Sequence, residues 1–105
     1  GGIGITTISV EIPQSYTLYQ NYPNPFNPTT KIRFSIPAFI ETTRRVVSLR
    51  IYDVLGKEIA VLVNENLKPG VYEIDWNAEN IPSGVYFYSL ITNEFTQTKK
   101  MVVLK

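Results

Sequence analysis

Apolar and polar residues alternate through most of the chain, and this alternation limits the folds that the chain can adopt. Ile32, Phe34 and Ile36 share one face of an extended segment, whereas Lys31 and Arg33 share the other. Successive side chains of a β-strand point to opposite faces, so the pattern predicts a strand with one buried face. About six such runs are separated by turn residues, and no run has the helical period.

Turn residues divide the chain into short strands. Gly56 lies in a turn at residues 53–57, where it can adopt a positive φ. Residues 85–92 are almost all apolar or aromatic, which predicts a central strand covered on both faces. Short strands with turn signals every 8–12 residues are typical of an immunoglobulin-like antiparallel β-sandwich, here of about seven strands. The other predicted strands are residues 31–36, 47–52, 58–63, 71–76 and 95–104, with residues 64–70 as a loop.

The N-terminal residues are harder to place. Ile8, Val10 and Ile12 alternate with polar residues, as in a half-buried strand, but the stretch before them is rich in Gly and Thr. We therefore interpret residues 1–12 as a linker or a first edge strand, and residues 13–105 as one domain.

Residues 13–28 contain four prolines. Each proline fixes its own φ and biases the preceding residue toward extended conformations, so neither a helix nor a central strand is expected here. The densest part, residues 22–28, could be a rigid recognition epitope. The interpretation that we favour is a cap, in which Tyr22 and Phe26 fill the open end of the core.

Composition excludes several classes of function. Ten Lys and Arg residues against nine Asp and Glu residues give a net charge of +1, too little for a nucleic-acid-binding stripe. No apolar run approaches the roughly 20 residues of a membrane-spanning helix, and the N-terminal residues lack the pattern of a signal peptide. The absence of Cys and His removes the usual nucleophile, general base and transition-metal ligands. We expect a non-enzymatic domain without catalytic residues, metal or cofactor.

Some side chains allow a second interpretation. Tyr72, Trp76, Tyr86 and Tyr88 could stack on a sugar, although their alternation within strands favours core packing. The lysines of residues 99–105 could contact a receptor or guard an edge strand against aggregation. Calcium could bind the oxygen atoms of Asp75, Asn77, Glu79 and Asn80, but such clusters are also ordinary in turns.

Segments along most of the chain resemble a known family in the same order. They are YQNYPNPFNPTTKI at residues 19–32, LRIYDVLGKE at 49–58, GVYEIDW at 70–76, SGVYFY at 83–88 and TKKMVVLK at 98–105. Together they resemble the type A C-terminal sorting domains of the type IX secretion system. Residues 38–45 form a longer connection than this family would lead us to expect, an insertion that a loop tolerates at small cost.

The resemblance implies a C-terminal sorting module on secreted or cell-surface proteins of certain Gram-negative bacteria. The attached N-terminal cargo crosses the inner membrane by its own signal peptide, and an outer-membrane translocon then recognises the module. In part of the family a sortase-like peptidase removes it. The immunoglobulin-like domain of flagellar hook-capping proteins is related, so fold alone does not settle function.

We expect the domain to be a monomer. An accessory module that binds carbohydrate or cell wall, and a structural spacer, are the alternative functions. The resemblance implies the following recognition residues: Tyr22, Pro23, Asn24, Pro25, Phe26, Asn27, Pro28, Gly56, Gly84, Tyr86, Lys99, Lys100 and Lys105.

Overall fold

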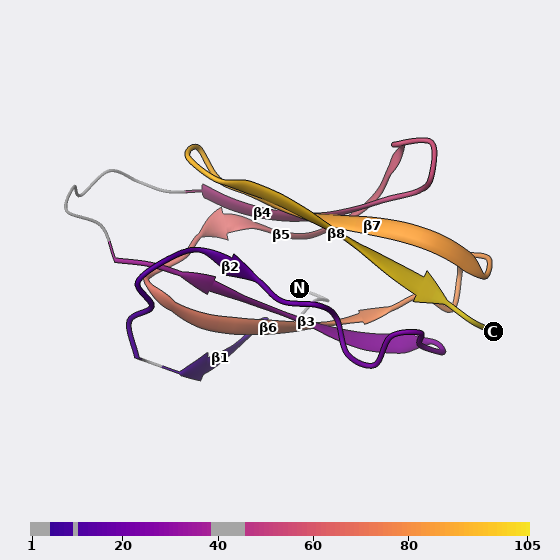
Figure 1. Cartoon of the computed structure of the whole chain (residues 1–105), viewed down its shortest axis with the longest axis horizontal. Coiled ribbons are helices and arrows are strands. Elements are labelled where there is room, and N and C mark those ends of the chain that lie inside the picture. Colours follow the sequence, from indigo (N-terminus) through magenta and orange to yellow (C-terminus); the bar gives the residue numbers. More distant parts are fainter. Residues whose placement is uncertain (1–4, 10, 39–45) are drawn as a thin grey trace.

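Two antiparallel sheets face one another in a computed structural model that describes residues 5–9, 11–38 and 46–105 (Figure 1). The described residues contain strands and no helix, so the predicted all-β sandwich is confirmed. One sheet has the order β1-β6-β3-β2 and the other β5-β4-β7-β8. The strands are β1 (Ile5–Ser9), β2 (Thr17–Leu18), β3 (Thr29–Ile36), β4 (Val46–Tyr52), β5 (Glu58–Asn66), β6 (Gly70–Asn77), β7 (Gly84–Ile91) and β8 (Thr96–Val103).

The first sheet is built on the pairing of β3 with β6. Ile32 lies opposite Ile74 and Phe34 opposite Tyr72, and these side chains are buried against the other sheet. The residues between these buried ones point outward. The alternation of apolar and polar residues in the sequence therefore corresponds to the inner and outer faces of this sheet.

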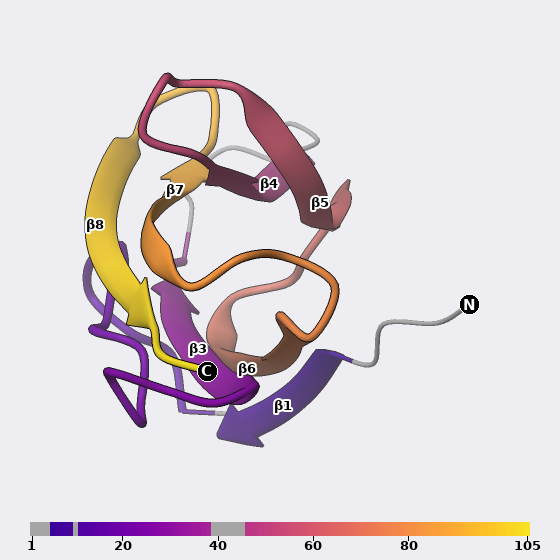
Figure 2. The ribbon, with the colours of Figure 1, turned by 90° about the vertical axis from the view of Figure 1, so that its right-hand side faces the viewer.

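The second sheet has β7 at its centre, between β4 and β8, as predicted. Leu49 lies opposite Leu90 and Ile51 opposite Tyr88, and all of them are fully buried. The prediction that both faces of this strand are covered is only partly right, because Phe87 on the outer face stays partly exposed. The end-on view shows the two sheets facing one another (Figure 2), and the buried apolar side chains form one core cluster.

The strand that follows the Gly56 turn is longer than predicted. We expected it to end at Val63, but β5 continues to Asn66, and Asn64 and Asn66 pair with Ser48 and Val46. These polar side chains are exposed, so the backbone ladder with β4 extends the strand without help from apolar burial. The predicted loop is therefore confined to residues 67–69.

The N-terminal strand also differs from its predicted position. The strand is β1, which pairs with the edge of β6 and has an irregularity between Thr7 and Ser9. Ile8 is 40% exposed and Ile12 59% exposed, so their alternation does not mark a buried face. The division of the chain after residue 12 stays a prediction, and residues 39–45 of the long connection lie outside the described part of the chain.

Replacing Trp76 by alanine tests the core. The indole is only 8% exposed and packs between the rings of Phe26 and Tyr86, with centroids 5.9 and 6.4 Å away. We expect Trp76→Ala to lower the free energy of unfolding by about 3–5 kcal/mol in urea denaturation. The exposed Tyr22 gives a matched aromatic control, since Tyr22→Ala should change it by about 0.5 kcal/mol or less. Equal effects of the two substitutions would contradict the packing described.

Candidate recognition surface

The proline-rich segment joins the two sheets along the edge formed by β2 and β8. At its start, Tyr22 and Lys31 exchange backbone hydrogen bonds of 3.0 and 2.9 Å with each other. At its end, the Phe26 amide donates to the Val102 carbonyl (3.1 Å), and the Leu104 amide donates to the Phe26 carbonyl (2.9 Å). Because Lys31 belongs to the first sheet and Val102 to the second, residues 22–26 bridge the sheets. We call residues 19–28 the clamp segment.

A buried hydroxyl group anchors the start of the clamp segment. Tyr88 rises from the central strand β7 and is completely buried. Its hydroxyl donates to the Tyr19 carbonyl (2.7 Å) and accepts from the Asn21 amide (2.8 Å). Burial raises the pKa of Tyr88 to about 12, against a smaller opposing effect of the hydrogen bond from Asn21. The phenol is therefore neutral at physiological pH and can donate and accept at the same time.

A buried amide side chain fixes the next turn of the clamp segment. The Asn21 side chain accepts from Gln20 Nε2 (2.7 Å) and donates to the Pro23 carbonyl (3.2 Å) and to Thr30 Oγ1 (3.0 Å). Thr30 in turn donates to the same carbonyl (2.8 Å), and Gln20 also donates to the Lys100 carbonyl (2.8 Å). The polar atoms of Asn21 thus have partners although the residue is only 2% exposed. No sequence pattern indicated this role, since Asn is ordinary beside prolines.

The cap interpretation is right for one aromatic residue of the clamp segment and wrong for the other. Phe26 is buried against Trp76, as predicted. Tyr22 is 79% exposed, because it pairs with Lys31, whose side chain faces outward. Pro23, Asn24, Pro25 and Asn27 are also exposed, and Pro28 is partly buried.

The lysines of the last strand do not form one basic patch. Lys99 lies opposite the core residue Tyr88, whereas Lys100 lies opposite Phe87, so the two lysines belong to opposite faces of the sheet. Lys105 is placed elsewhere again: its amide donates to Ser83 Oγ (2.9 Å), and its Nζ donates to the carbonyls of Glu79 and Ile81. The ammonium group of Lys105 therefore holds the loop between β6 and β7.

The remaining predicted recognition residues shape the backbone. Gly56 has a φ of 83° and Gly84 a φ of 152°, values that residues with a Cβ rarely adopt. Tyr86 is buried, and its hydroxyl donates to the Pro82 carbonyl (2.8 Å). These residues can influence recognition through the shape of the fold rather than by direct contact.

The aromatic residues considered for sugar stacking belong to the core. Tyr72, Trp76, Tyr86 and Tyr88 are all buried, with exposures of 8% or less. Their alternation within strands therefore reflects core packing, as predicted, and these rings offer no platform to a sugar.

The polar cluster considered for calcium is explained by local contacts. Asn77 Oδ1 accepts from the Glu79 amide (2.9 Å), as in an ordinary turn, and Asp75 pairs with Lys31. Within the described ranges, no group of three or more acidic side chains is placed to hold a metal ion. The same residues include no helix long and apolar enough to cross a membrane.

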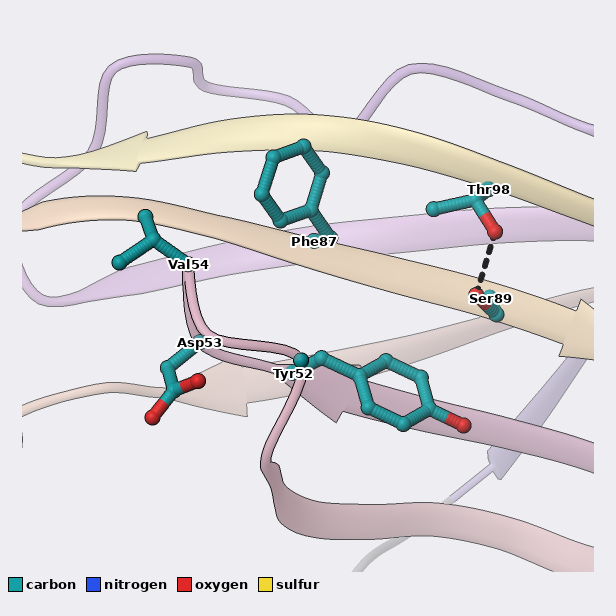
Figure 3. Close-up of a pocket in the computed structure, with 7 residues that line it drawn as sticks. Tyr52, Asp53, Val54, Phe87, Ser89 and Thr98 are labelled. Atoms are coloured by element: carbon teal, nitrogen blue, oxygen red, sulfur yellow. Dashed lines mark hydrogen bonds between the residues drawn. The ribbon is translucent and has the colours of Figure 1, made fainter.

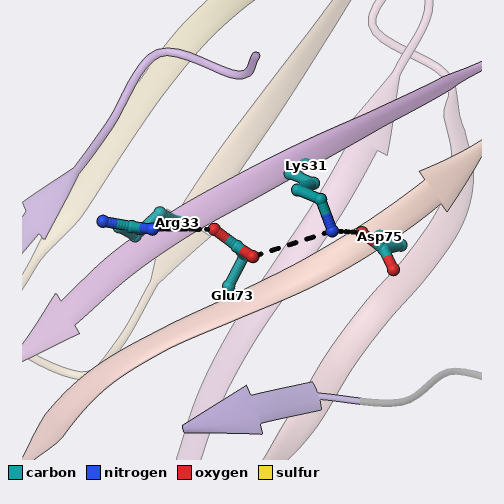
Figure 4. A network of polar contacts seen from close by, with 4 residues as sticks. All are labelled: Lys31, Arg33, Glu73 and Asp75. Atoms are coloured by element: carbon teal, nitrogen blue, oxygen red, sulfur yellow. Dashed lines mark hydrogen bonds and ion pairs between the residues drawn. The ribbon is translucent and has the colours of Figure 1, made fainter. Parts of the chain in front are cut away.

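The outer face of the first sheet carries a ladder of opposite charges (Figure 4). Lys31 Nζ lies 2.8 Å from Asp75 and 3.8 Å from Glu73, and Arg33 lies 3.0 Å from Glu73. The hydrogen bond and the charge of Asp75 raise the pKa of Lys31. Because the charges neutralise one another, this face offers little attraction to a charged partner.

Fold and clamp together define a small β-sandwich module in which a proline-rich segment locks two sheets. The family model of the secretion system C-terminal sorting domain matches residues 20–104. The chain belongs to this family, which confirms the resemblance to type IX sorting domains. The match identifies a sorting domain of a protein that is secreted or attached to the cell surface via the outer membrane. No curated protein matches the chain.

Replacing the Tyr88 hydroxyl tests the clamp. In Tyr88→Phe the ring still fills the core, but the Tyr19 carbonyl and the buried Asn21 amide lose their partner. We expect a loss of about 1–3 kcal/mol in the free energy of unfolding and faster hydrogen exchange at the Asn21 amide. The control is Tyr86→Phe, which removes a single bond to a loop carbonyl and should leave the exchange of Asn21 unchanged. Unaltered exchange in both variants would contradict the anchoring role.

The raised pKa of Tyr88 also predicts how stability depends on pH. The folded protein keeps this proton up to about pH 12, whereas an unfolded tyrosine releases it near pH 10. The stabilisation from the neutral phenol is therefore complete below about pH 10 and is lost as the pH rises through about 12. Between these values we expect the wild-type free energy of unfolding to fall more steeply with pH than that of Tyr88→Phe, measured by urea denaturation. Parallel curves would rule out the linkage.

Proposed function

We propose that this domain directs a larger protein, attached at its N-terminal side, across the outer membrane by type IX secretion. The observation that carries the proposal is the family match over residues 20–104. In this proposal the cargo first crosses the inner membrane by its own signal peptide, and outer-membrane components of the translocon then bind the domain. The domain acts as a monomer, without catalytic activity or cofactor, and a sortase-like peptidase is a candidate partner after export.

The hydrogen bonds of the clamp segment support recognition of the folded domain rather than of a linear peptide. The Asn24 side chain accepts from the Val102 amide (2.9 Å), and Phe26 exchanges backbone bonds with Val102 and Leu104. The segments at residues 19–32 and 98–105, which resemble the opening and closing motifs of the family, are thus hydrogen-bonded to each other in the folded domain. A partner that needs Tyr22, Pro23 and Lys100 in fixed positions can find them only after folding.

The recognition residues divide into contact and support residues in this proposal. Tyr22, Pro23, Pro25 and Lys100 are exposed and can touch a partner. Phe26, Tyr86 and the two glycines support the surface from within, and Lys105 does so by holding the loop after β6. Substitution of a support residue should impair sorting only as far as it disturbs the fold.

Fusion to a reporter tests the proposed function. The whole chain, residues 1–105, attached to a periplasmic reporter should carry it out of a type IX-competent cell, measured as reporter activity in the medium or on the surface. A strain without the translocon should retain the reporter in the periplasm, and so should a fusion that carries a destabilised Trp76→Ala tail. Retention of the intact fusion in the competent strain would contradict the proposal.

A further inference from the structure

A groove of about 690 Å³ crosses the outer face of the first sheet beside the clamp segment. The clamp segment lines it with Tyr19, Gln20 and Tyr22, strands β3 and β6 form its floor, and Ile8 of β1 lies on the far side. Tyr19 is 43% exposed and Tyr22 79% exposed, so core packing does not account for these two rings. We call this site the tyrosine groove.

The backbone holds both tyrosines in fixed positions. The Tyr19 amide donates to the Arg33 carbonyl (3.0 Å), and the Tyr19 carbonyl accepts from the buried Tyr88 hydroxyl. Tyr22 exchanges two backbone hydrogen bonds with Lys31. A tyrosine side chain has only two χ angles to order, so a ligand that packs on these rings pays a small entropic cost.

The floor of the tyrosine groove offers hydrogen-bond donors. Arg33 Nε and Nη2 both donate to Glu73 Oε2, at 3.3 and 3.0 Å (Figure 4). Two of the five N–H groups of a guanidinium are thus engaged, and the other N–H groups can donate to a ligand. Lys31 directs one donor at Asp75 (2.8 Å), and its side chain is 57% exposed. Both cations are therefore oriented by the sheet and still accessible.

Hydrogen-bond acceptors lie among these donors. Gln20 Nε2 donates to Asn21 Oδ1 (2.7 Å) and to the Lys100 carbonyl (2.8 Å), which leaves the side-chain oxygen of Gln20 as an acceptor. The Glu73 carboxylate can accept more bonds than Arg33 supplies, and the hydroxyls of the two tyrosines both donate and accept. The lining thus mixes donors and acceptors beside aromatic rings.

This mixture favours a ligand with hydroxyl groups, since each hydroxyl donates and accepts as well. The lining contains two acidic residues, Glu11 and Glu73, and two basic residues, Lys31 and Arg33. A phosphate or carboxylate ligand has only acceptors, so it would bind the two cations but be repelled by the two carboxylates. The ligand that satisfies all of these groups carries hydroxyls and no charge.

The strand order favours recognition by side chains rather than by backbone. Strand β3 lies between β2 and β6, and β6 lies between β1 and β3, so the floor offers no free strand edge. An extended peptide therefore cannot add to the sheet here, although that mode supplies most of the affinity of many peptide complexes. The volume of the groove lies within the roughly 300–1,000 Å³ of sites for small ligands.

We propose that the tyrosine groove binds an uncharged oligosaccharide built of pyranose rings with equatorial substituents. Such a ring exposes C–H groups on its faces, which pack on the rings of Tyr19 and Tyr22. The hydroxyls around its edge bind Arg33, Glu73 and Gln20. The inference goes beyond sorting and does not depend on it: saccharide binding gives a secreted or surface-attached protein a second, non-covalent contact with carbohydrate.

Titration of the whole chain, residues 1–105, with cellotetraose and with chitotetraose tests the proposal. In ¹⁵N-edited NMR spectra we expect at least one of these neutral tetrasaccharides to shift the amide signals of Tyr19, Tyr22 and Arg33, with a Kd of about 1 mM or lower. The signal of Phe87, on the outer face of the other sheet, should not move. Tetragalacturonic acid, which has a similar length but carries carboxylates, should bind at least tenfold more weakly.

Two variants test the two kinds of contact. Tyr22→Ala removes an exposed ring and should weaken binding roughly tenfold, whereas Leu55→Ala, a truncation of the 89% exposed Leu55 on the other sheet, should not change it. Arg33→Met removes the donors but keeps an unbranched side chain, and should weaken binding to a similar extent. Its matched control is Arg50→Met, which breaks the 2.8 Å ion pair with Glu58 in the other sheet and should bind normally.

The outcomes decide between the saccharide and other occupants. Absence of binding by both neutral tetrasaccharides at about 10 mM, or tighter binding of the acidic one, would overturn the proposal. Binding that neither Tyr22→Ala nor Arg33→Met weakens would place the sugar elsewhere and overturn the groove. If no saccharide binds and the Arg33→Met fusion is not exported, the groove belongs to a protein partner. Retention of the unmodified fusion would overturn sorting and leave saccharide binding intact.

Discussion

The Tyr88 hydroxyl is the point at which both sheets and the proline-rich segment meet. It is carried by the central strand of one sheet, and it binds backbone groups of a segment that pairs with the other sheet. A buried phenol without these partners would be costly, and so would an unpaired Asn21 amide. The Tyr88 hydroxyl and the backbone groups of the clamp segment therefore depend on each other for hydrogen bonds. These bonds hold the clamp segment across the edge of the sandwich.

The clamp also solves the problem of an open edge. Along the β2 and β8 side, β2 contributes only two residues to its sheet, and β8 would expose a row of unpaired backbone groups. Prolines limit the conformations of the crossing segment before it docks. Asn24 and Phe26 then bind the amide and carbonyl of Val102 in β8 and the amide of Leu104 just after it. The docking of the clamp segment along this edge both pairs the backbone groups of β8 and leaves Tyr22 exposed.

Local pattern predicted the fold well because each strand of the core has one buried face. Alternation identified β3, β4 and β6, a nearly continuous apolar run identified β7, and Gly56 marked its turn, since these features depend on neighbouring residues alone. The features that the sequence did not reveal depend on distant partners. The extension of β5 depends on β4, the exposure of Tyr22 follows from its pairing with Lys31, and the network around Asn21 joins residues from three segments. A shallow hollow on the outer face of the second sheet (Figure 3) was missed for the same reason, because its lining combines Tyr52, Asp53, Val54, Gly56, Phe87, Ser89 and Thr98.

A family match includes residues that stabilise the fold and residues that contact a partner. The structure helps to distinguish the two groups. Phe26, Tyr86 and Gly84 lie in motifs that resemble the sorting domains, yet their contacts are internal. Lys99 and Lys100 are neighbours in the sequence but face opposite sides of β8, so a single partner surface cannot engage both without reaching around an edge strand. Leu55 shows the opposite behaviour, since it contributes almost nothing to the core and its turn is held rigid without it. In the proposed function, contact residues are those whose removal leaves stability unchanged, and by that criterion the exposed Tyr22 and Lys100 are better candidates than the buried members of the motifs.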